Sequence, residues 1–182
     1  DFFEPNQWKN LIKQIAYLST TPGRMERFSS SLSADIIVDF AHTPDALEKL
    51  ILSCRQHYKE SKLWLVFGCG GERDIGKRSL MGQIAAKFAD FIFLTDDNPR
   101  NEDPKKIVDD ICKGIRSRSY KVVHDRPSAI LEAVSRADLN DCIILAGKGH
   151  ETTQTFSNKI IQQSDRKFVQ SLANYDNTEQ KK

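Results

Sequence analysis

The sequence lacks several features that mark particular classes of protein. No apolar run approaches the ~18 residues that a membrane-spanning helix needs. The first residues, Asp1 to Pro5, contain neither a basic region nor the apolar stretch of a secretory leader. There is no internal repeat and no low-complexity tract. We therefore expect neither a membrane span nor a leader, and we expect one folded unit rather than an array.

Charge of one sign is not in excess. The chain has 27 Lys and Arg against 25 Asp and Glu, which gives a net charge of +2. A basic excess is typical of proteins that bind nucleic acid or an anionic membrane, so we expect neither as a main partner. Hydrophobic residues make up 39% of the 182 residues, which suffices for one ordinary α/β domain with short extensions.

Cysteine is scarce and widely spaced. Cys54, Cys69, Cys112 and Cys142 stand too far apart for a zinc clamp, and three of them fall in apolar stretches. We expect buried free thiols in a protein of the reducing cytoplasm rather than disulfides. The chain does not begin with Met, and we expect it to be a fragment of a longer protein.

Short apolar runs recur after Thr21-Pro22-Gly23, which breaks the pattern and marks a predicted domain boundary. Continuous runs of this length are typical of strands buried on both faces, as in a parallel sheet. The runs are Asp35–Phe40, Leu63–Phe67, Phe91–Leu94, Lys121–His124 and Cys142–Ala146. Segments with helical periodicity separate them, and the strand spacing of about 20–30 residues is what helix crossovers require. These segments include helices that begin near Pro44, Pro104 and Pro127 and a stripe from Leu80.

The two ends of the chain follow other patterns. A helix is predicted over Gln7–Leu18, before the boundary. Near the other end, Thr152–Phe156 and Lys159–Gln162 predict a hairpin, and a helix follows from about Ser164. We therefore predict an α/β fold with a doubly wound, mostly parallel, Rossmann-like sheet and a C-terminal β-hairpin. Residues 1–21 would precede this domain, 22–173 would form it, and 174–182 would be a disordered polar tail.

Each predicted sheet strand ends in polar or glycine-rich residues. Ligands of doubly wound sheets bind beyond the carboxyl ends of the strands, so a single binding edge is predicted. It comprises residues 39–43, 69–77, 95–100, 125–126 and 147–151.

The segment Gly71–Lys77 has the spacing of a phosphate loop. However, Arg78 follows where such loops use Ser or Thr to hold magnesium, and the carboxylates of Glu72 and Asp74 would repel phosphate. A tight strand-to-helix turn is a second interpretation. A third is a mixed-charge site for a zwitterion, because opposite charges at short spacing suit a ligand with both ammonium and carboxylate groups.

Two further segments show the same mixture of charges. Asp96–Arg100 could also be a capped turn into the helix at Pro104, and in Gly147–Glu151 the residue His150 by itself suggests a structural hydrogen bond rather than a base. The glycines there would let backbone groups approach a ligand. Asp39–Pro44 could bind ribose through Asp39 and phosphate through His42, and it could equally be a helix-capping turn.

Taken together and in order, these segments resemble the C-terminal domain of the Mur ligase family. The segments are Gly23–Arg27, Asp39–Pro44, Phe67–Lys77, Asp97–Arg100 and Gly147–Glu151, within a resemblance that covers about Pro22 to Leu172. The branch most like this chain is the UDP-N-acetylmuramoyl-tripeptide synthetases, which add the third residue of the peptidoglycan stem peptide. Departures are modest: Phe40, Glu72 and Ser79 stand where Tyr, Asp and Pro are commoner.

The resemblance implies a cytoplasmic, monomeric three-domain enzyme of cell-wall synthesis. Residues 1–21 would be the end of its central ATPase domain or a linker. ATP would phosphorylate the D-glutamate carboxylate of UDP-MurNAc-L-Ala-D-Glu, and the amine of the incoming amino acid would attack the acyl phosphate. ATP and Mg²⁺ are the implied cofactors, with the magnesium ligands in the absent central domain. The implied partners are that domain, the N-terminal domain and the two substrates.

The resemblance also implies roles for particular residues, none of them catalytic. Arg24, Asp39 and His42 would face the nucleotide. The amino acid would be bound by Arg73, Asp97, Asn98, Arg100, Gly147 and Glu151. The arginines would grip the distal carboxylate of meso-diaminopimelate, while Glu151 and the Gly147 carbonyl would hold its distal ammonium. Lysine lacks that carboxylate, so in this resemblance Arg100 marks the diaminopimelate type.

Other functions remain open at this stage. The chain could come from a lysine-adding Mur ligase or a folylpolyglutamate synthetase, although Arg100 with Glu151 argues against both. It could also be a stand-alone module that binds a nucleotide or an amino acid. A third alternative is a phosphotransferase that uses Gly71–Lys77 as its phosphate loop.

Overall fold

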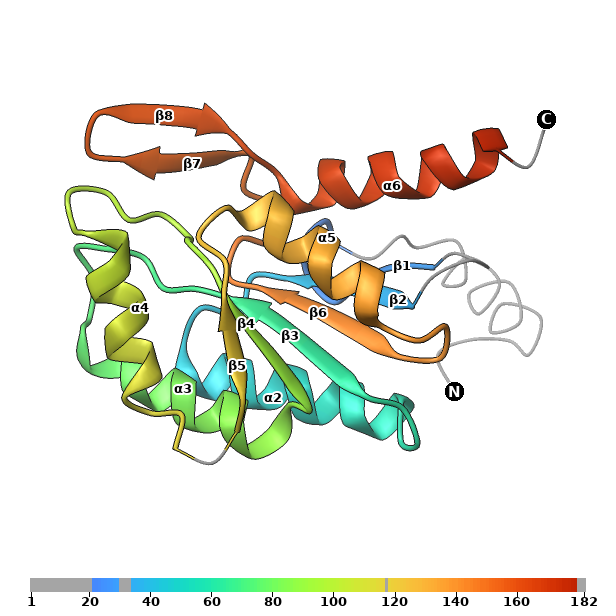
Figure 1. The fold of residues 1–182 in the computed structure, drawn as a ribbon, viewed down its shortest axis with the longest axis horizontal. Coiled ribbons are helices and arrows are strands. Elements are labelled where there is room, and N and C mark those ends of the chain that lie inside the picture. The colour runs from blue at the N-terminus through green and yellow to red at the C-terminus, as the bar shows by residue number, and fades with distance from the viewer. Residues whose placement is uncertain (1–20, 30–33, 117, 180–182) are drawn as a thin grey trace, which may run out of the picture.

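The computed structural model describes residues 21–29, 34–116 and 118–179. Over these residues the chain forms a six-stranded sheet with helices on both faces, and a separate two-stranded hairpin (Figure 1). The helix predicted over Gln7–Leu18 lies outside the described residues. None of the described helices is long and apolar enough to cross a membrane.

The sheet is mostly parallel, as predicted. Across it, the strands are β1 (Glu26–Phe28), β2 (Asp35–Asp39), β6 (Cys142–Ala146), β3 (Leu63–Phe67), β4 (Phe91–Leu94) and β5 (Tyr120–Val122). Only β1 runs antiparallel to its neighbour; the other adjacent pairs are parallel. Ile144 of the central strand β6 stands opposite Ile37 on one side and Leu65 on the other. Most of the apolar runs are thus strands buried on both faces, as predicted. The run Lys121–His124 is the exception, because β5 covers Tyr120–Val122 and all three of its residues are exposed.

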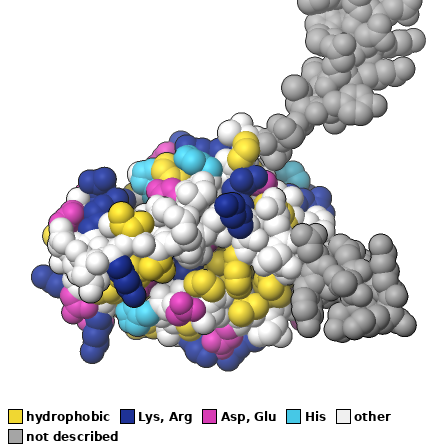
Figure 2. Space-filling view, turned by 90° about the horizontal axis from the view of Figure 1, so that it is seen from above, with side chains coloured by type: hydrophobic (Ala, Val, Ile, Leu, Met, Phe, Trp, Pro, Cys, Tyr) yellow, Lys and Arg dark blue, Asp and Glu magenta, His cyan; other side chains and the backbone are white. Residues whose placement is uncertain are grey.

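The helices form two layers. One face of the sheet is covered by α2 (Pro44–His57), α3 (Gly76–Phe88) and α4 (Pro104–Cys112), and the other by α5 (Arg126–Arg136) and α6 (Asp165–Glu179) (Figure 1). Because side chains alternate along a strand, Leu65 packs with the first layer and Val66 with the second. The face that carries α5, α6 and the hairpin shows basic and acidic side chains interspersed (Figure 2).

Side-chain caps begin most of these helices. Thr43, Asp103 and Asp125 each accept a hydrogen bond from a backbone N–H in the first turn, and a proline follows within the first two helical positions. This is the signal from which the starts of α2 and α4 were predicted. The C-terminal hairpin, β7 (Thr153–Phe156) paired with β8 (Lys159–Gln162), is also confirmed.

Some boundaries differ from those predicted. β1 was not predicted, because three partly exposed residues carry no periodic signal. The helix that begins at Pro104, α4, ends at Cys112, and Ile115 is buried shortly after it. Residues 174–182 were assigned to a disordered tail, whereas α6 continues to Glu179. A polar composition argues against burial, but it does not prevent helical hydrogen bonding.

A buried ion pair joins the two helices of the second layer to the sheet. Nε and Nη2 of Arg126 lie 2.9 and 2.7 Å from the carboxylate of Asp165, and both side chains are fully buried. Arg126 Nη2 also donates to the carbonyl of Ala146, the last residue of β6, at 3.0 Å. Burial by itself raises the pKa of Asp165, but the charge and hydrogen bonds of Arg126 outweigh it and hold the pKa below its usual value. The pair therefore fixes where the chain leaves β6.

Breaking this pair should cost far more than removing a surface arginine of the same helix. We expect Arg126→Met to lower the free energy of unfolding by about 3–5 kcal/mol, because it leaves Asp165 buried without its partner. Arg136, which pairs with Glu132 on the surface of α5, is the matched control. Its change to Met should cost less than about 1 kcal/mol. Urea unfolding of both variants provides the comparison, and equal losses would contradict the role given to the buried pair.

Candidate functional site

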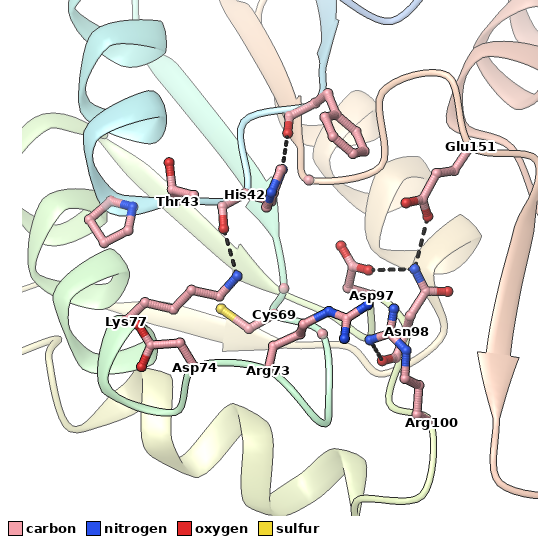
Figure 3. Close-up of a pocket in the computed structure, with 15 residues that line it drawn as sticks. His42, Thr43, Cys69, Arg73, Asp74, Lys77, Asp97, Asn98, Arg100 and Glu151 are labelled. Atoms are coloured by element: carbon pink, nitrogen blue, oxygen red, sulfur yellow. Dashed lines mark hydrogen bonds between the residues drawn. The ribbon is translucent and has the colours of Figure 1, made fainter.

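A cavity of about 410 Å³ opens at the carboxyl ends of β2, β3, β4 and β6 (Figure 3). Its walls come from the loops that follow these strands. β6 lies between β2 and β3, and the chain returns to it across the opposite face of the sheet. Such a change of direction creates the crevice in which doubly wound sheets bind ligands. The cavity therefore lies on the binding edge that the sequence predicted.

One predicted part of that edge does not reach the cavity. Residues 125–126 were included because they follow a strand, but neither lines the cavity. Asp125 caps α5, and Arg126 is buried against Asp165. These two polar side chains therefore stabilise the fold and do not contribute to the cavity.

Most of the residues proposed from the sequence line the cavity together: His42, Arg73, Asp97, Asn98, Arg100, Gly147 and Glu151. Arg24 and Asp39 do not line it: Arg24 is exposed in the turn before β1, and Asp39 is buried at the end of β2. The carboxylate of Asp39 accepts hydrogen bonds from the backbone N–H groups of Met25 (2.8 Å) and Ala41 (2.7 Å). The guanidinium of Arg24 lies 4.7 Å from the centre of the Phe40 ring.

Asn98 connects the acidic residues of the cavity. Its Nδ2 donates to Asp97 Oδ1 at 2.9 Å and to Glu151 Oε2 at 2.8 Å. Its Oδ1 accepts from the Thr155 backbone N–H at 3.0 Å and from Lys148 Nζ at 3.4 Å. Two donor and two acceptor positions are thus all used, which determines the orientation of the amide. Asn98 therefore fixes the two carboxylates relative to each other.

The wall formed by Asp97, Glu151 and Gly147 is an acidic corner of the cavity. Burial raises the pKa of Asp97, and the positive charges of Arg126 and Lys148 act against that rise. Gly147 has a φ of 110°, and a Cβ there would lie 2.7 Å from Asp97 Oδ2. Only glycine therefore lets the backbone pass this close to the carboxylate. Such a corner suits a cationic group.

A basic corner of the cavity is formed by Arg73 and Arg100. Arg100 Nη1 donates to the carbonyl oxygens of Gly71 (2.7 Å) and Asn98 (3.4 Å), and Arg73 Nη1 lies 3.3 Å from its neighbour's carbonyl oxygen. Neither arginine forms an ion pair with a carboxylate of the described residues. Figure 3 shows both guanidiniums beside Asp97 and Asn98. Planar groups held only by carbonyl oxygens keep their charge for an anion, and a carboxylate matches their geometry.

Arg100 occupies a strained backbone position. Its φ is 54°, in the left-handed region that non-glycine residues seldom adopt. The β7 strand holds it there, because the Arg100 N–H donates to the Thr155 carbonyl at 3.0 Å. Strain of this kind concentrates where a side chain must be aimed at a ligand.

The turn Gly71–Lys77 is not built as a phosphate loop. Arg78 is fully buried, with ion pairs of 2.8 Å to Glu102 and 3.1 Å to Asp110, and it does not line the cavity. Lys77 Nζ donates to the carbonyl of His42 at 2.8 Å. The segment therefore forms a tight turn between a strand and a helix. Its side chains Arg73 and Lys77 also line the cavity and bring positive charge to it.

Other residues at the site were not assigned a role from the sequence. Phe40, Cys69, Asp74 and Lys77 line the cavity, and Lys148 is completely buried behind it. They lie within the motifs that were singled out, but residue type alone does not distinguish an exposed lysine from a buried one. Burial raises the pKa of the Cys69 thiol to about 12, so this group is not a nucleophile at neutral pH.

Over the described residues, no group of three or more His, Cys, Asp and Glu side chains is placed to hold a metal ion.

Two neighbouring glycines at the basic corner should respond differently to substitution. A Cβ at Gly71 would lie 1.9 Å from the carbonyl oxygen of Pro99, so Gly71→Ala must displace backbone. We expect it to cost about 1–3 kcal/mol of unfolding free energy. A Cβ at Gly70 would lie 2.9 Å from Nη1 at the end of the Arg100 side chain, and 3.8 Å from Arg73 Cγ and from the Asn98 carbonyl oxygen. Gly70→Ala should therefore unfold in urea within about 0.5 kcal/mol of the wild type, and a large loss would show that Arg100 is fixed more rigidly than this.

Comparison with known proteins agrees with the motifs. The family model described as Mur ligase, glutamate ligase domain, matches residues 23–149. The chain is 49% identical over 159 residues to a UDP-N-acetylmuramoyl-L-alanyl-D-glutamate–2,6-diaminopimelate ligase of Alkalilimnicola ehrlichii, a match that covers 87% of the chain and 32% of that protein. The protein of the same name from Vibrio vulnificus is 48% identical over 163 residues, which covers 89% of the chain and 33% of the relative.

Solved structures show the same relationship. A structure of a ligase with this name has a TM-score of 0.79 and 38% identity, over 92% of this chain and 34% of its own. A folylpolyglutamate synthase from Thermotoga maritima, at a TM-score of 0.55 and 22% identity over 70% of this chain and 28% of its own, shares the fold. The chain spans about a third of the length of the curated relatives it matches. The family that the motifs predicted is thus confirmed: this chain belongs to the Mur ligases, through their glutamate ligase domain.

Proposed function

We propose that this chain is the C-terminal domain of an ATP-dependent ligase that adds meso-diaminopimelate to UDP-MurNAc-L-Ala-D-Glu in peptidoglycan synthesis. The observation that carries the proposal is one cavity with an acidic corner and a basic corner, formed by residues of the matching motifs. Relatives at 48 and 49% identity are named for 2,6-diaminopimelate, which supports it. Because the chain is a third of their length, the activity would belong to the full-length protein.

The two corners suit a substrate with a second amino-acid end. At the distal end of meso-diaminopimelate, a carboxylate and an ammonium are attached to the same carbon. Arg73 and Arg100 would bind that carboxylate, since their donors reach only carbonyl oxygens within the described chain. Glu151, with the Gly147 carbonyl and the nearby Asp97, would bind the ammonium. Asn98 would hold the acidic residues in place, because its amide donates to both carboxylates.

The same arrangement would exclude L-lysine. Lysine has the distal ammonium but no distal carboxylate, so two guanidiniums would remain without an anion in a partly closed site. Sites built for a polar group reject analogues that lack it by up to about 10⁴-fold. Arg100 is the residue on which this selectivity would depend most, because strained backbone geometry aims it at the cavity.

Arg24, Asp39 and His42 would contact the nucleotide when this domain closes over the central one. His42 lines the cavity, and Asp39 ends β2 directly before Phe40, which also lines it, so the nucleotide and the amino acid would bind close together. Nδ1 of His42 lies 2.8 Å from the Phe40 carbonyl oxygen, and this leaves Nε2 for a phosphate or ribose oxygen. ATP, when bound, would supply the phosphate that activates the D-glutamate carboxylate. We place the Mg²⁺ ligands in the central domain, and the whole enzyme in the cytoplasm as a monomer.

Substrate preference tests the proposal in the full-length enzyme. We expect the wild type to ligate meso-diaminopimelate in strong preference to L-lysine. Arg100→Ala should raise KM for diaminopimelate about 10- to 100-fold, as expected for the loss of a hydrogen bond between charged groups, with a smaller effect on kcat. Arg136→Ala, on the surface of α5, is the control and should leave both constants unchanged. Equal use of lysine by the wild type would refute the proposed substrate.

The chain by itself should not catalyse the reaction. In the proposal, the phosphate loop and magnesium ligands belong to the central domain, while this chain supplies binding groups only. We expect no release of inorganic phosphate when it is mixed with ATP, Mg²⁺, UDP-MurNAc-L-Ala-D-Glu and meso-diaminopimelate, whereas the full-length enzyme should release phosphate under the same conditions. Phosphate release by the chain alone would disprove the assignment of the catalytic groups to the central domain.

A further inference from the structure

Lys148 is a charged side chain that is completely buried beside the cavity without lining it. Its Nζ donates to the Thr153 carbonyl at 2.7 Å, to Glu151 Oε2 at 3.0 Å and to Asn98 Oδ1 at 3.4 Å. An ammonium group has three hydrogens, so these acceptors account for all of them. Lysine is seldom fully buried, because its charge is costly to remove from water unless it is paired. The role of Lys148 can therefore be inferred from the groups with which its ammonium forms hydrogen bonds, among them Glu151 and Asn98.

The surrounding charges leave Lys148 with two carboxylates to balance. From α5 and α6, Arg126 and Asp165 pair with each other. The loops contribute Asp97 and Glu151, which Asn98 joins. Arg73 and Arg100 belong to the basic corner and form hydrogen bonds with carbonyl groups.

Lys148 also determines how Glu151 is presented. The Oε2 atom of Glu151 accepts hydrogen bonds from both Asn98 Nδ2 and Lys148 Nζ. Two donors on one oxygen fix the rotation of the carboxylate, and among the described residues no donor contacts the other oxygen, Oε1. The side chain of Glu151 is 34% exposed and lines the cavity, so this second oxygen is available to a ligand.

We propose that Lys148 is a positioning residue of the amino-acid site, which holds Glu151 and Asn98 from behind so that the acidic corner can bind the distal ammonium of the substrate. The inference rests on the proposed function and adds to it a residue that does not touch the substrate. The ammonium of Lys148 pairs with Oε2 of Glu151 and leaves Oε1 for the ammonium of the substrate.

The same charge affects how the corner responds to pH. Burial raises the pKa of Asp97, and Arg126 and Lys148 oppose this rise, whereas Glu151 and Asp165 add to it. Without Lys148 the pKa of Asp97 rises further, so as the pH falls this carboxylate becomes protonated earlier than in the wild type. A neutral Asp97 no longer attracts an ammonium. The acid limb of kcat/KM for diaminopimelate should therefore move to higher pH.

Steady-state kinetics of Lys148→Met in the full-length ligase test this role. We expect KM for meso-diaminopimelate to rise about 10- to 100-fold, the effect of losing one or two charge-assisted contacts. KM for ATP should remain unchanged, and the acid limb should shift as described. Because KM does not depend on the fraction of enzyme that is folded, lower stability of the variant does not obscure the result. Lys105→Met, an exposed lysine of α4, is the control and should behave as the wild type.

A second variant separates charge from packing. Lys148→Arg keeps the positive charge in an altered shape, so it should retain the wild-type acid limb and show a smaller rise in KM than Lys148→Met. The inference is overturned if Lys148→Met leaves KM for diaminopimelate unchanged, or if it only lowers kcat while KM and the pH profile remain the same. Failure of the wild type to use diaminopimelate would instead refute the proposed function, so the two failures are distinguishable.

Discussion

The side-chain amide of Asn98 joins three segments that meet at the end of the sheet. It belongs to the loop after β4, donates to Glu151 in the loop after β6, and accepts from the backbone of Thr155 in the hairpin. The backbone carbonyl oxygen of Asn98 accepts from the N–H of Gly71, in the turn after β3. A buried amide with every donor and acceptor used cannot rotate without losing several bonds at once. Asn98 therefore links the acidic corner to Arg100 of the basic corner, whose Nη1 donates to the Asn98 carbonyl oxygen.

Buried charges support this arrangement from outside the cavity. Arg126 ties α5 and α6 to the end of β6, and Arg78, in the first turn of α3, pairs with Glu102 and Asp110. Each such charge is costly to bury and is retained with its partner nearby. In both cases an arginine holds the base of a loop whose tip lines the cavity.

Much of the fold and most of the cavity could be predicted from the sequence. The runs Leu63–Phe67 and Cys142–Ala146 coincide with strands because both of their faces are buried. The cavity residues could be grouped because parallel strands bring their carboxyl ends to one edge. The position of β6 between β2 and β3 could not be predicted, since strand order depends on packing between distant segments. Burial of Lys148 and Arg126 was missed for the same reason, because the sequence does not show which distant segments cover a charged residue that follows a strand.

The β7–β8 hairpin contributes to the cavity through backbone atoms of a residue that does not line it. The N–H of Thr155 reaches Asn98 and its carbonyl reaches Arg100, on either side of Pro99. Because both contacts are made by the main chain, they do not depend on which side chain occupies position 155. A comparison of sequences would therefore give little reason to single out that position. Grafting residues 97–100 onto a related ligase would transfer the arginine. It would not transfer the backbone conformation that directs Arg100 into the cavity, unless the hairpin were transferred as well.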